Sequence, residues 1–540
     1  MKEKTRDRSL FSRALRAALD KHVIVAFLIL LQIAAIVYAV VSRGIYSAVF
    51  LGVCQLVGFI VSVHIIVKRG KSAYKFVWLF TVITLPVFGT LFYIIFYRQS
   101  SSRRFSKKVK NSEFFMKEDG LSLIESDVKA AEADFPEYLS NIHYLEYGAG
   151  FPVCGGTEAE YLKTGEIFYE RLLKELKKAE KYIFLEFFII RDGEMWQGIY
   201  EILKEKAERG VVVRVLYDDI GSLKGLPEKF RSELKKHGIE CAVFNAFKPF
   251  LISMQNNRDH RKIVSIDGKT AFTGGVNLAD EYINKLNRFG HWKDAGVMLR
   301  GKAAWNLTAM FLQNYEIATK TRSDYSRFFP ADFWDEAEKA TAETENAKSG
   351  KVDSREVFKR EFFQPYTDSP TDSEEVGEHV YLQTVYSAKK YLYITTPYLI
   401  IDGRMTDALI LAAKSGVDVR IITPGHGDKK FVHNVTRSYY KELIEGGVKI
   451  YEYSKGFIHS KTFVTDDKAA VVGTTNLDYR SLYLHFECGV AAYGQKFATS
   501  VKEDFCEVLK VCKPISAEDC KENAFKRIYT AFLRLFAPLM

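Results

Sequence analysis

Cysteine is scarce in this chain of 540 residues: its seven cysteines are scattered, include no CxxC pair and do not cluster with histidine. The odd number and the lack of regular spacing argue against a disulfide framework, and the lack of clusters argues against a zinc site. We therefore expect isolated reduced thiols, which suits a catalytic domain in a reducing compartment. The hydrophobic content of 47% excludes a chain that is disordered throughout.

Acidic residues are nearly absent from the first 110 positions, which hold 3 of them against 18 basic residues. This part carries a net charge of +15, so the remainder carries −5 and the whole chain +10. The total alone would favour a nucleic acid or an anionic membrane as partner. Because sequence-independent nucleic-acid binding depends on clustered basic residues, the acidic remainder predicts that no nucleic acid is bound there.

Three long runs without Asp, Glu, Lys or Arg lie in the same N-terminal part, at residues 23–41, 46–67 and 76–97. Each is long enough to cross a hydrocarbon layer of about 30 Å as a helix. The first run is too long for the apolar region of a signal peptide and has no small-residue cleavage site after it. We predict transmembrane helices within an anchor over residues 1–110, and a multi-pass protein of the cell membrane.

Basic clusters flank all three runs, and the positive-inside rule favours a cytoplasmic position for every one of them. An odd number of full crossings cannot achieve this. We therefore expect one run to be interfacial or re-entrant, and the third is favoured because Pro86 and Gly89 interrupt it. The main part of the chain is then predicted to be cytoplasmic.

Beyond the anchor the chain repeats itself. Two segments read H-x-K-x4-D, and an asparagine follows each histidine 17 positions later. The matched residues are His260, Lys262, Asp267 and Asn277 in the first copy and His459, Lys461, Asp466 and Asn476 in the second. Two copies with four matched positions indicate an internal duplication.

Apolar, β-branched runs alternate with helical stretches around both copies. This alternation predicts an α/β fold, with mostly parallel or mixed sheets covered by helices. We place a first lobe at residues 120–345, a connector at 346–364 and a second lobe at 365–515. An amphipathic helix is predicted within 516–540, where it either packs on the body or, as a sharper alternative, lies in a membrane interface.

The duplicated residue types suit a two-step displacement at phosphorus. One histidine can attack the phosphorus while the other protonates the departing alkoxide. The two lysines and two asparagines can surround the non-bridging oxygens. The lysines supply the positive charge, so no metal or other cofactor is expected.

These motifs and several further blocks resemble the phospholipase D superfamily, and within it the bacterial cardiolipin synthases. The blocks occur in the family's order: the segment from Lys68, LEFFIIRDG from Leu185, LYDDIGS from Leu216, HRKIVSIDG from His260, FTGGVNLADEY from Phe272, GHWKD from Gly290, GFIHSKT from Gly456, VGTTNLDYRS from Val472 and HFE from His485. The family usually has two membrane segments, so the first run is additional. His485 stands where asparagine is more frequent, and Ala295 and Gly296 stand where threonine and histidine are common.

The resemblance implies two pseudo-symmetric phospholipase D-like α/β lobes and transfer of a phosphatidyl group between lipids. His260 would attack phosphatidylglycerol, glycerol would leave, and a second phosphatidylglycerol would accept the phosphatidyl group to give cardiolipin. His459 would act as acid and then as base, with Lys262, Lys461, Asn277 and Asn476 at the phosphoryl oxygens. The partners are thus membrane phospholipids and the bilayer; the sequence indicates no oligomeric state.

Four acidic residues complete the candidate site. Asp267 and Asp466 belong to the motif, but their positions near strand ends favour a role in a turn or a lobe contact. Asp294 and Glu487 follow the motif histidines of their own halves by 34 and 28 residues and could orient an imidazole. Alternative acceptors remain open: water would make the enzyme a phospholipase D, another alcohol a different headgroup synthase. A nuclease would use the same chemistry but is disfavoured by the charge.

Overall fold

The computed structural model describes residues 21–42, 44–68, 71–97, 100–247, 253–331, 360–372 and 374–539. The chain divides into two compact units. The anchor comprises Met1–Lys107, Phe247–Asn257 and Leu535–Met540, and the body comprises Lys108–Ala246 and Arg258–Arg534. Most of the predicted connector at 346–364 lies outside the described residues, which resume at position 360.

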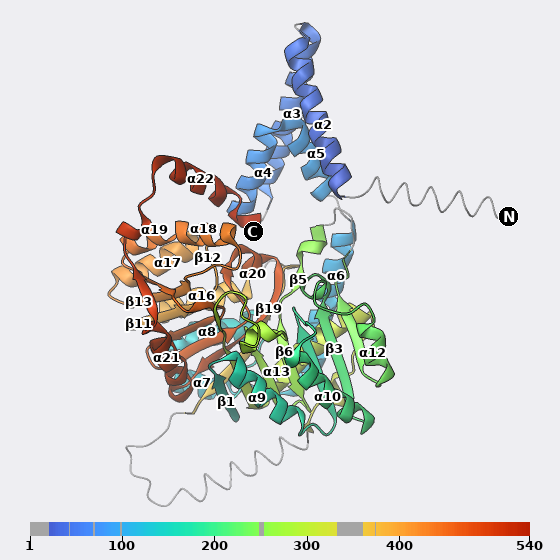
Figure 1. The fold of residues 1–540 in the computed structure, drawn as a ribbon, viewed down its shortest axis with the longest axis vertical. Coiled ribbons are helices and arrows are strands. Elements are labelled where there is room, and N and C mark those ends of the chain that lie inside the picture. Colours follow the sequence, from blue (N-terminus) through green and yellow to red (C-terminus); the bar gives the residue numbers. More distant parts are fainter. Residues whose placement is uncertain are drawn as a thin grey trace, which may run out of the picture. The chain divides into compact units, whose positions relative to one another are not determined.

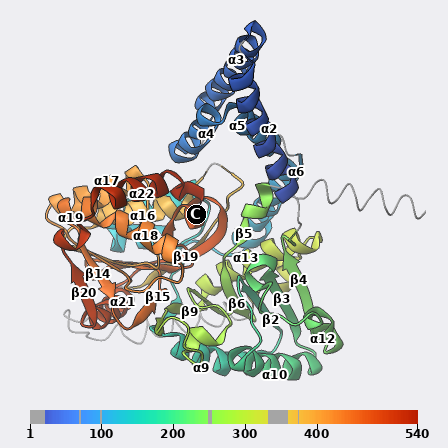
Figure 2. The same cartoon turned by 45° about the horizontal axis from the view of Figure 1, so that its top comes forward.

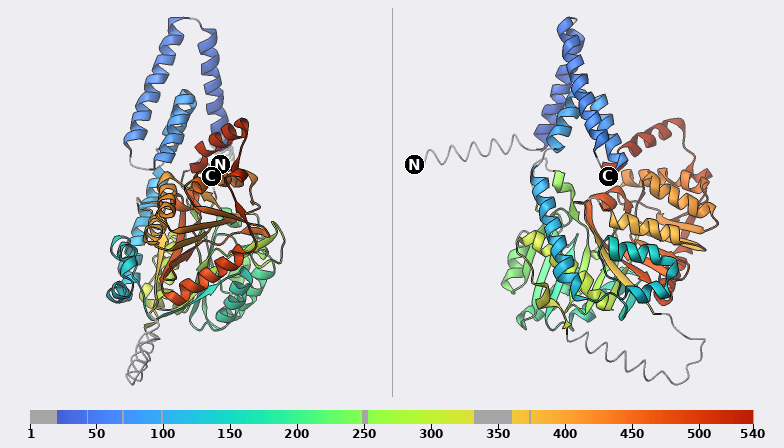
Figure 3. Two further views of the ribbon diagram at one scale, coloured as in Figure 1. Left: turned by 90° about the vertical axis from the view of Figure 1, so that its left-hand side faces the viewer. Right: turned by 180° about the vertical axis from the view of Figure 1, so that it is seen from behind.

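Two helices of the anchor are long and apolar enough to cross a membrane, α2 (Lys21–Val41) and α3 (Ile45–Val67). They are the two long helices of this unit in Figure 3. At about 1.5 Å per residue, each matches the thickness of a hydrocarbon layer. The first two apolar runs therefore form candidate membrane spans.

The third apolar run forms two short helices, α4 (Ser72–Thr84) and α5 (Pro86–Tyr97), so the expectation that it could cross as one helix is wrong. Proline has no backbone N–H and disfavours helical geometry in the residue before it, which ends α4. Beyond this break the chain folds back: a Cβ at Gly89 would lie only 2.4 Å from the carbonyl oxygen of Thr81. The two helices therefore form a tight hairpin that requires glycine at this crossing.

Gln32 is the one polar side chain of the first run, and it supports this hairpin. Its Oε1 accepts hydrogen bonds from the backbone N–H groups of Val87 and Phe88, each at 3.1 Å. These amides belong to the first turn of α5 and have no partner within that helix. Because an unpaired amide in hydrocarbon is costly, Gln32 stabilises a helix that begins inside the apolar unit.

The body contains two large sheets built from buried, β-branched strands. The first has the strand order β1 (Thr157–Leu162), β9 (Gly296–Gly301), β7 (Thr270–Gly274), β6 (Lys262–Ile266), β2 (Tyr182–Phe187), β3 (Val212–Asp218), β4 (Glu240–Phe244). Strands β2, β3 and β4 are parallel, and the others are antiparallel to their neighbours. This is a mixed sheet, as the sequence predicts.

The second sheet has the order β10 (Phe362–Asp368), β19 (His485–Tyr493), β17 (Ala469–Gly473), β16 (Thr462–Thr465), β11 (Tyr391–Thr395), β13 (Asp418–Pro424), β14 (Lys449–Tyr453), β20 (Cys512–Ile515). Strands β11, β13 and β14 are parallel, with antiparallel pairs on either side of them. From β10 to β14, strand order and direction follow those of the first sheet from β1 to β4.

Helices cover both sheets (Figures 1 and 2). On the first sheet, α10 (Glu194–Glu208) and α12 (Phe230–Lys236) pack on β3 and β4, while α13 (Lys302–Thr319) packs across β6 and β7. The second sheet is covered by α16 (Val376–Ser387), α17 (Gly403–Lys414), α19 (Tyr440–Glu445) and α21 (Gln495–Leu509). The remaining longer helices are α6 (Ser100–Phe115), α7 (Val128–Asp134), α8 (Leu139–His143), α9 (Gly165–Leu176), α18 (Lys430–Ser438), α20 (Tyr479–Tyr483) and α22 (Ala524–Leu535).

Two short strand pairs join the halves of the body. Strand β5 (Arg258–Asp259) lies parallel to the start of β19, and β8 (His291–Lys293) lies parallel to β15 (Gly456–Ile458). In each pair, a strand just before a motif histidine adds to a strand of the other half. This crossing of the halves positions the candidate site.

Candidate functional site

Each motif histidine is fixed by the backbone of the opposite half. The N–H of His260, directly after β5, donates to the carbonyl oxygen of Phe486 at 2.9 Å. The N–H of His459, directly after β15, donates to the carbonyl oxygen of Lys293 at 2.7 Å. Both histidines are more than nine-tenths buried. The backbone at each reactive imidazole is thus set by contacts between halves.

A carboxylate of the second half holds the ring of His260. Nδ1 of His260 lies 2.9 Å from Oε1 of Glu487 and 3.0 Å from Oε2. Glu487 is fully buried and also accepts hydrogen bonds from the hydroxyls of Thr474 and Ser481, the latter at 2.7 Å. With Nδ1–H donated to the carboxylate, the lone pair of the imidazole is on Nε2, the nitrogen that can attack.

The mirror arrangement holds the second histidine. Nδ1 of His459 lies 2.7 Å from Oδ2 of Asp294, which belongs to the first half. The other oxygen of Asp294 accepts the N–H of Ala295 at 2.9 Å. Burial raises the pKa of Asp294, but the neighbouring His459 and Lys461 outweigh it and lower that pKa to about 2. Asp294 is therefore a permanent anion beside the imidazole.

The two motif lysines are almost completely buried next to the histidines. Lys262 Nζ donates to the carbonyl oxygen of His260 at 2.6 Å, and Lys461 Nζ donates to that of His459. Burial lowers the pKa of Lys262 to about 8 and that of Lys461 to about 7. An anionic ligand beside them would favour their charged forms.

Burial, followed by the charges of the lysines, also governs the histidines. It lowers the pKa of His459 to about 4 and holds that of His260 well below the ordinary value. Both imidazoles are therefore neutral near pH 7 in the empty site. A neutral imidazole is the form that can act as a nucleophile or a base.

The two predicted asparagines lie in different environments. Asn277 is fully buried; its Oδ1 accepts the N–H of Ile189 at 3.0 Å and its Nδ2 donates to the hydroxyl of Tyr282 at 2.7 Å. The side-chain oxygen of Asn476 is buried and has no hydrogen-bond partner in the part of the chain that is described. Asn476 thus has more capacity for a ligand than Asn277.

The two motif aspartates act on the backbone. Asp267 accepts the N–H groups of three successive residues, 180–182, at 2.7–2.8 Å, and Asp466 accepts those of residues 389–391 at 2.7–3.0 Å. Each carboxylate holds the chain entering the central strand of its sheet. Neither is bonded to a motif histidine or lysine within the described residues, so their contacts are those of structural residues, with no sign of the catalytic role for which the motif made them candidates.

His485 is a third histidine in the site, at a position where the resemblance noted a departure. Its ring lies 5.4 Å from that of His260, and its Nδ1 is 3.8 Å from Glu487 Oε1, beyond hydrogen-bond distance. Burial lowers its pKa to about 3, so it is neutral. Sequence reasoning did not assign a role to His485, Thr474 or Ser481, although all three lie in the quoted blocks.

Ligand atoms of His260, His485 and Glu487 lie within 4.8 Å of one another, a spacing that a metal ion could use. The bond between His260 and Glu487 already accounts for two of these side chains. The site as built offers two neutral imidazoles, two lysines and two buried carboxylates, a set suited to nucleophilic attack on an anionic phosphodiester followed by proton transfer.

Comparisons with known proteins agree with this chemistry. A family model described as cardiolipin synthase, PLD-like domain, matches twice, at residues 172–288 and 381–509. The chain is 34% identical to a cardiolipin synthase of Geobacillus thermodenitrificans over 92% of its length and 94% of that protein, and 41% identical to an uncharacterized protein of Streptococcus mutans over 86% and 96%. Among solved structures, the phosphatidylserine synthase of Haemophilus influenzae shares the fold, with a TM-score of 0.55 and 15% identity over 75% of this chain and 98% of that one.

Proposed function

Because the chain belongs to the cardiolipin synthase family of the phospholipase D superfamily and is therefore a membrane-associated phosphatidyltransferase, we propose that it makes cardiolipin and glycerol from two molecules of phosphatidylglycerol. The observation that carries the proposal is the reciprocal pairing of each motif histidine with a carboxylate of the other half. The two sheets with matching strand order are, in this proposal, pseudo-symmetric lobes around one site.

In the first step, Nε2 of His260 attacks the phosphorus of one phosphatidylglycerol and a phosphorus–nitrogen bond forms. The bond between phosphorus and the glycerol oxygen breaks, and a protonated His459 gives its Nε2 proton to that oxygen. Lys262 and Lys461, charged in the presence of the phosphodiester, bind the non-bridging oxygens. Glu487 stabilises the positive charge that develops on His260.

In the second step, the terminal hydroxyl of another phosphatidylglycerol attacks the phosphohistidine. Neutral His459 takes the hydroxyl proton, held in the required tautomer by Asp294. The phosphorus–nitrogen bond breaks, cardiolipin forms, and His260 returns to its initial state. Asn476, with its unpartnered amide oxygen, and Asn277 are the neutral groups proposed to line the phosphoryl site.

The proposed topology has two full crossings, α2 and α3, followed by the α4–α5 hairpin as a re-entrant element. Both ends of such an anchor face the same side. All three basic clusters then lie in the cytoplasm, as the positive-inside rule requires, and so does the body. A reporter fused after Lys110 that is active only outside the cell would contradict this topology.

Product analysis tests the function directly. The purified full-length protein in vesicles of phosphatidylglycerol is expected to form cardiolipin and glycerol in equal amounts. Phosphatidic acid as the main product would show that water is the acceptor and would replace the proposal by a phospholipase D. Addition of other alcohols separates a general headgroup-exchange enzyme from a synthase that accepts only phosphatidylglycerol.

The lowered lysine pKa values predict an unusual pH profile. As pH rises through 7 to 8, Lys461 and then Lys262 lose their protons in the empty site, so kcat/KM is expected to fall by up to about tenfold per unit for each group. Acidification to about pH 5 leaves the neutral nucleophile intact, because the pKa of His260 is well below its ordinary value. Initial rates in vesicles of fixed composition at high salt measure this; a kcat/KM that increases from pH 8 to 10 would contradict it.

A further inference from the structure

The C-terminal helix α22 of the body exposes an apolar stripe. Phe525, Ile528, Tyr529 and Phe532 are 83%, 69%, 47% and 53% exposed. Their spacing of three and four residues places them on one side of the helix, whereas Thr530 and Leu533 are buried. Four large exposed apolar side chains on one helix mark a surface that binds something less polar than water.

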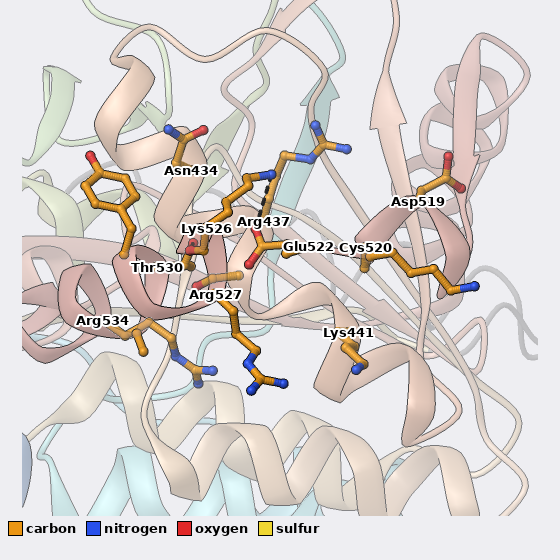
Figure 4. Close-up of a pocket in the computed structure, with 14 residues that line it drawn as sticks. Asn434, Arg437, Lys441, Asp519, Cys520, Glu522, Lys526, Arg527, Thr530 and Arg534 are labelled. Carbon is orange, nitrogen blue, oxygen red and sulfur yellow. Dashed lines mark hydrogen bonds and ion pairs between the residues drawn. The ribbon is translucent and has the colours of Figure 1, made fainter. Parts of the chain in front are cut away.

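The same helix forms one wall of a cationic pocket of about 460 Å³, whose other walls come from α18, α19 and the segment that precedes α22 (Figure 4). Six basic side chains line the pocket against two acidic ones, Asp519 and Glu522. The basic residues are Arg437, Lys441, Lys521, Lys526, Arg527 and Arg534. This concentration of positive charge contrasts with the net negative charge of the chain beyond residue 110.

Several of these cations have acidic neighbours, but the pairs are accessible to solvent. Lys526 lies 3.2 Å from Glu522, and Arg534 lies 3.3 Å from Glu442. Exposed pairs of this kind contribute little to stability and can be exchanged for a stronger anion. Arg527 has no ion pair with an acidic residue in the described parts of the chain, and in Figure 4 its side chain extends in the same direction as that of Arg534.

We propose that this pocket binds the phosphate of an anionic phospholipid headgroup while the apolar stripe of α22 lies among the acyl chains of the same leaflet. Phe525 and Ile528 alternate along one helix with Lys526 and Arg527, so a helix lying in the interface brings both features to one membrane surface. Guanidinium groups bind phosphate oxygens in pairs, and each basic residue near an anionic surface adds attraction.

Chain connectivity supports a lipid as the occupant. Phe536, two residues after Arg534, belongs to the anchor, where its ring packs at 6.3 Å against Phe80 of the apolar helix α4. The end of α22 therefore continues directly into a unit that is built for hydrocarbon. A nucleic acid would use the cations but not the aliphatic and aromatic stripe, so an anionic lipid accounts for both features. This site shares no residue with the histidine site.

Lipid-specific fluorescence quenching tests the proposal in the full-length protein. Phe525→Trp is introduced together with His260→Ala, which prevents any conversion of the lipids, and the same protein without the tryptophan supplies the background. The protein is reconstituted in phosphatidylcholine vesicles that contain brominated phosphatidylglycerol or brominated phosphatidylcholine at the same mole fraction. We expect the new tryptophan to be quenched by both lipids, about fivefold more effectively by the anionic one.

Arg527→Glu is expected to remove this preference while quenching by brominated phosphatidylcholine persists, and Arg527→Lys should retain most of it. Arg231→Glu, which changes an exposed arginine on α12, is the matched control and should have no effect. Equal quenching by both lipids in the parent would overturn the headgroup site, and no quenching would overturn the membrane contact. Loss of the preference on addition of inorganic phosphate would reassign the pocket to free phosphate. Because binding is read without turnover, these outcomes are independent of the proposed synthase activity.

Discussion

His260→Ala and His459→Ala are each expected to lower cardiolipin formation by about 10⁴-fold or more, and to differ in what they trap. An activated phosphatidyl ester whose leaving group needs no proton should still label the His459→Ala protein, because His260 can attack without a general acid. The label should be acid-labile, as expected of a phosphorus–nitrogen bond, and should map to His260. The His260→Ala protein should remain unlabelled.

His237→Ala changes a partly exposed histidine at the end of α12 and is the control for loss of an imidazole as such. It should leave both rate and labelling unchanged. Labelling of His260→Ala with none of His459→Ala would reverse the two roles. Labelling of neither single variant by the activated ester, with both proteins folded, would refute the covalent intermediate.

Glu487→Gln is expected to give the second large effect, a fall in kcat of about 10² to 10⁴ with little change in KM. The amide would present a donor to either Nδ1 of His260 or a hydroxyl that now donates to the carboxylate. The ring would then favour the tautomer that has its proton on Nε2, which cannot attack. Asp294→Asn should act in the same way on His459, since Asp294 Oδ2 lies 2.7 Å from its Nδ1.

Glu175→Gln is the matched control for removing a buried carboxylate, because Glu175 is 2% exposed and pairs with Arg300 outside the histidine site. It is expected to affect thermal stability but not kcat. Steady-state kinetics and melting temperatures of the three variants separate the roles. If Glu487→Gln retains kcat within about threefold while its stability falls, Glu487 is a structural residue and the orienting role is wrong.

The residue types of the site and their duplication could be predicted from the sequence, since a histidine and a lysine two positions apart lie on one side of a strand wherever that strand goes. The pairing of acids with histidines could not. Asp294 and Glu487 were counted from the histidines of their own halves, but each contacts the histidine of the other half. The short pairs of β5 with β19 and β8 with β15 cause this exchange, and strands of two or three residues have no recognisable sequence pattern.

The anchor shows the same division. Hydropathy identified three apolar runs, and Pro86 marked the weak point of the third. The hairpin itself depends on the close crossing of Gly89 and Thr81 and on hydrogen bonds that Gln32 makes to amides 55 and 56 positions away. Gln32 by itself is only one polar residue in an apolar run, so its partner could not be read from the chain.

The sequence by itself determined the chemistry this protein has available: a membrane anchor, an acidic body and two sets of histidine, lysine and asparagine. These follow from side-chain type and local spacing, which do not depend on the rest of the fold. Only the tertiary structure decided which carboxylate holds which imidazole, that Asp267 and Asp466 hold strand entrances, and that the cations near α22 gather beside its apolar stripe. Each of these depends on contacts between segments far apart in the chain, whose pairing is set by packing of the whole body.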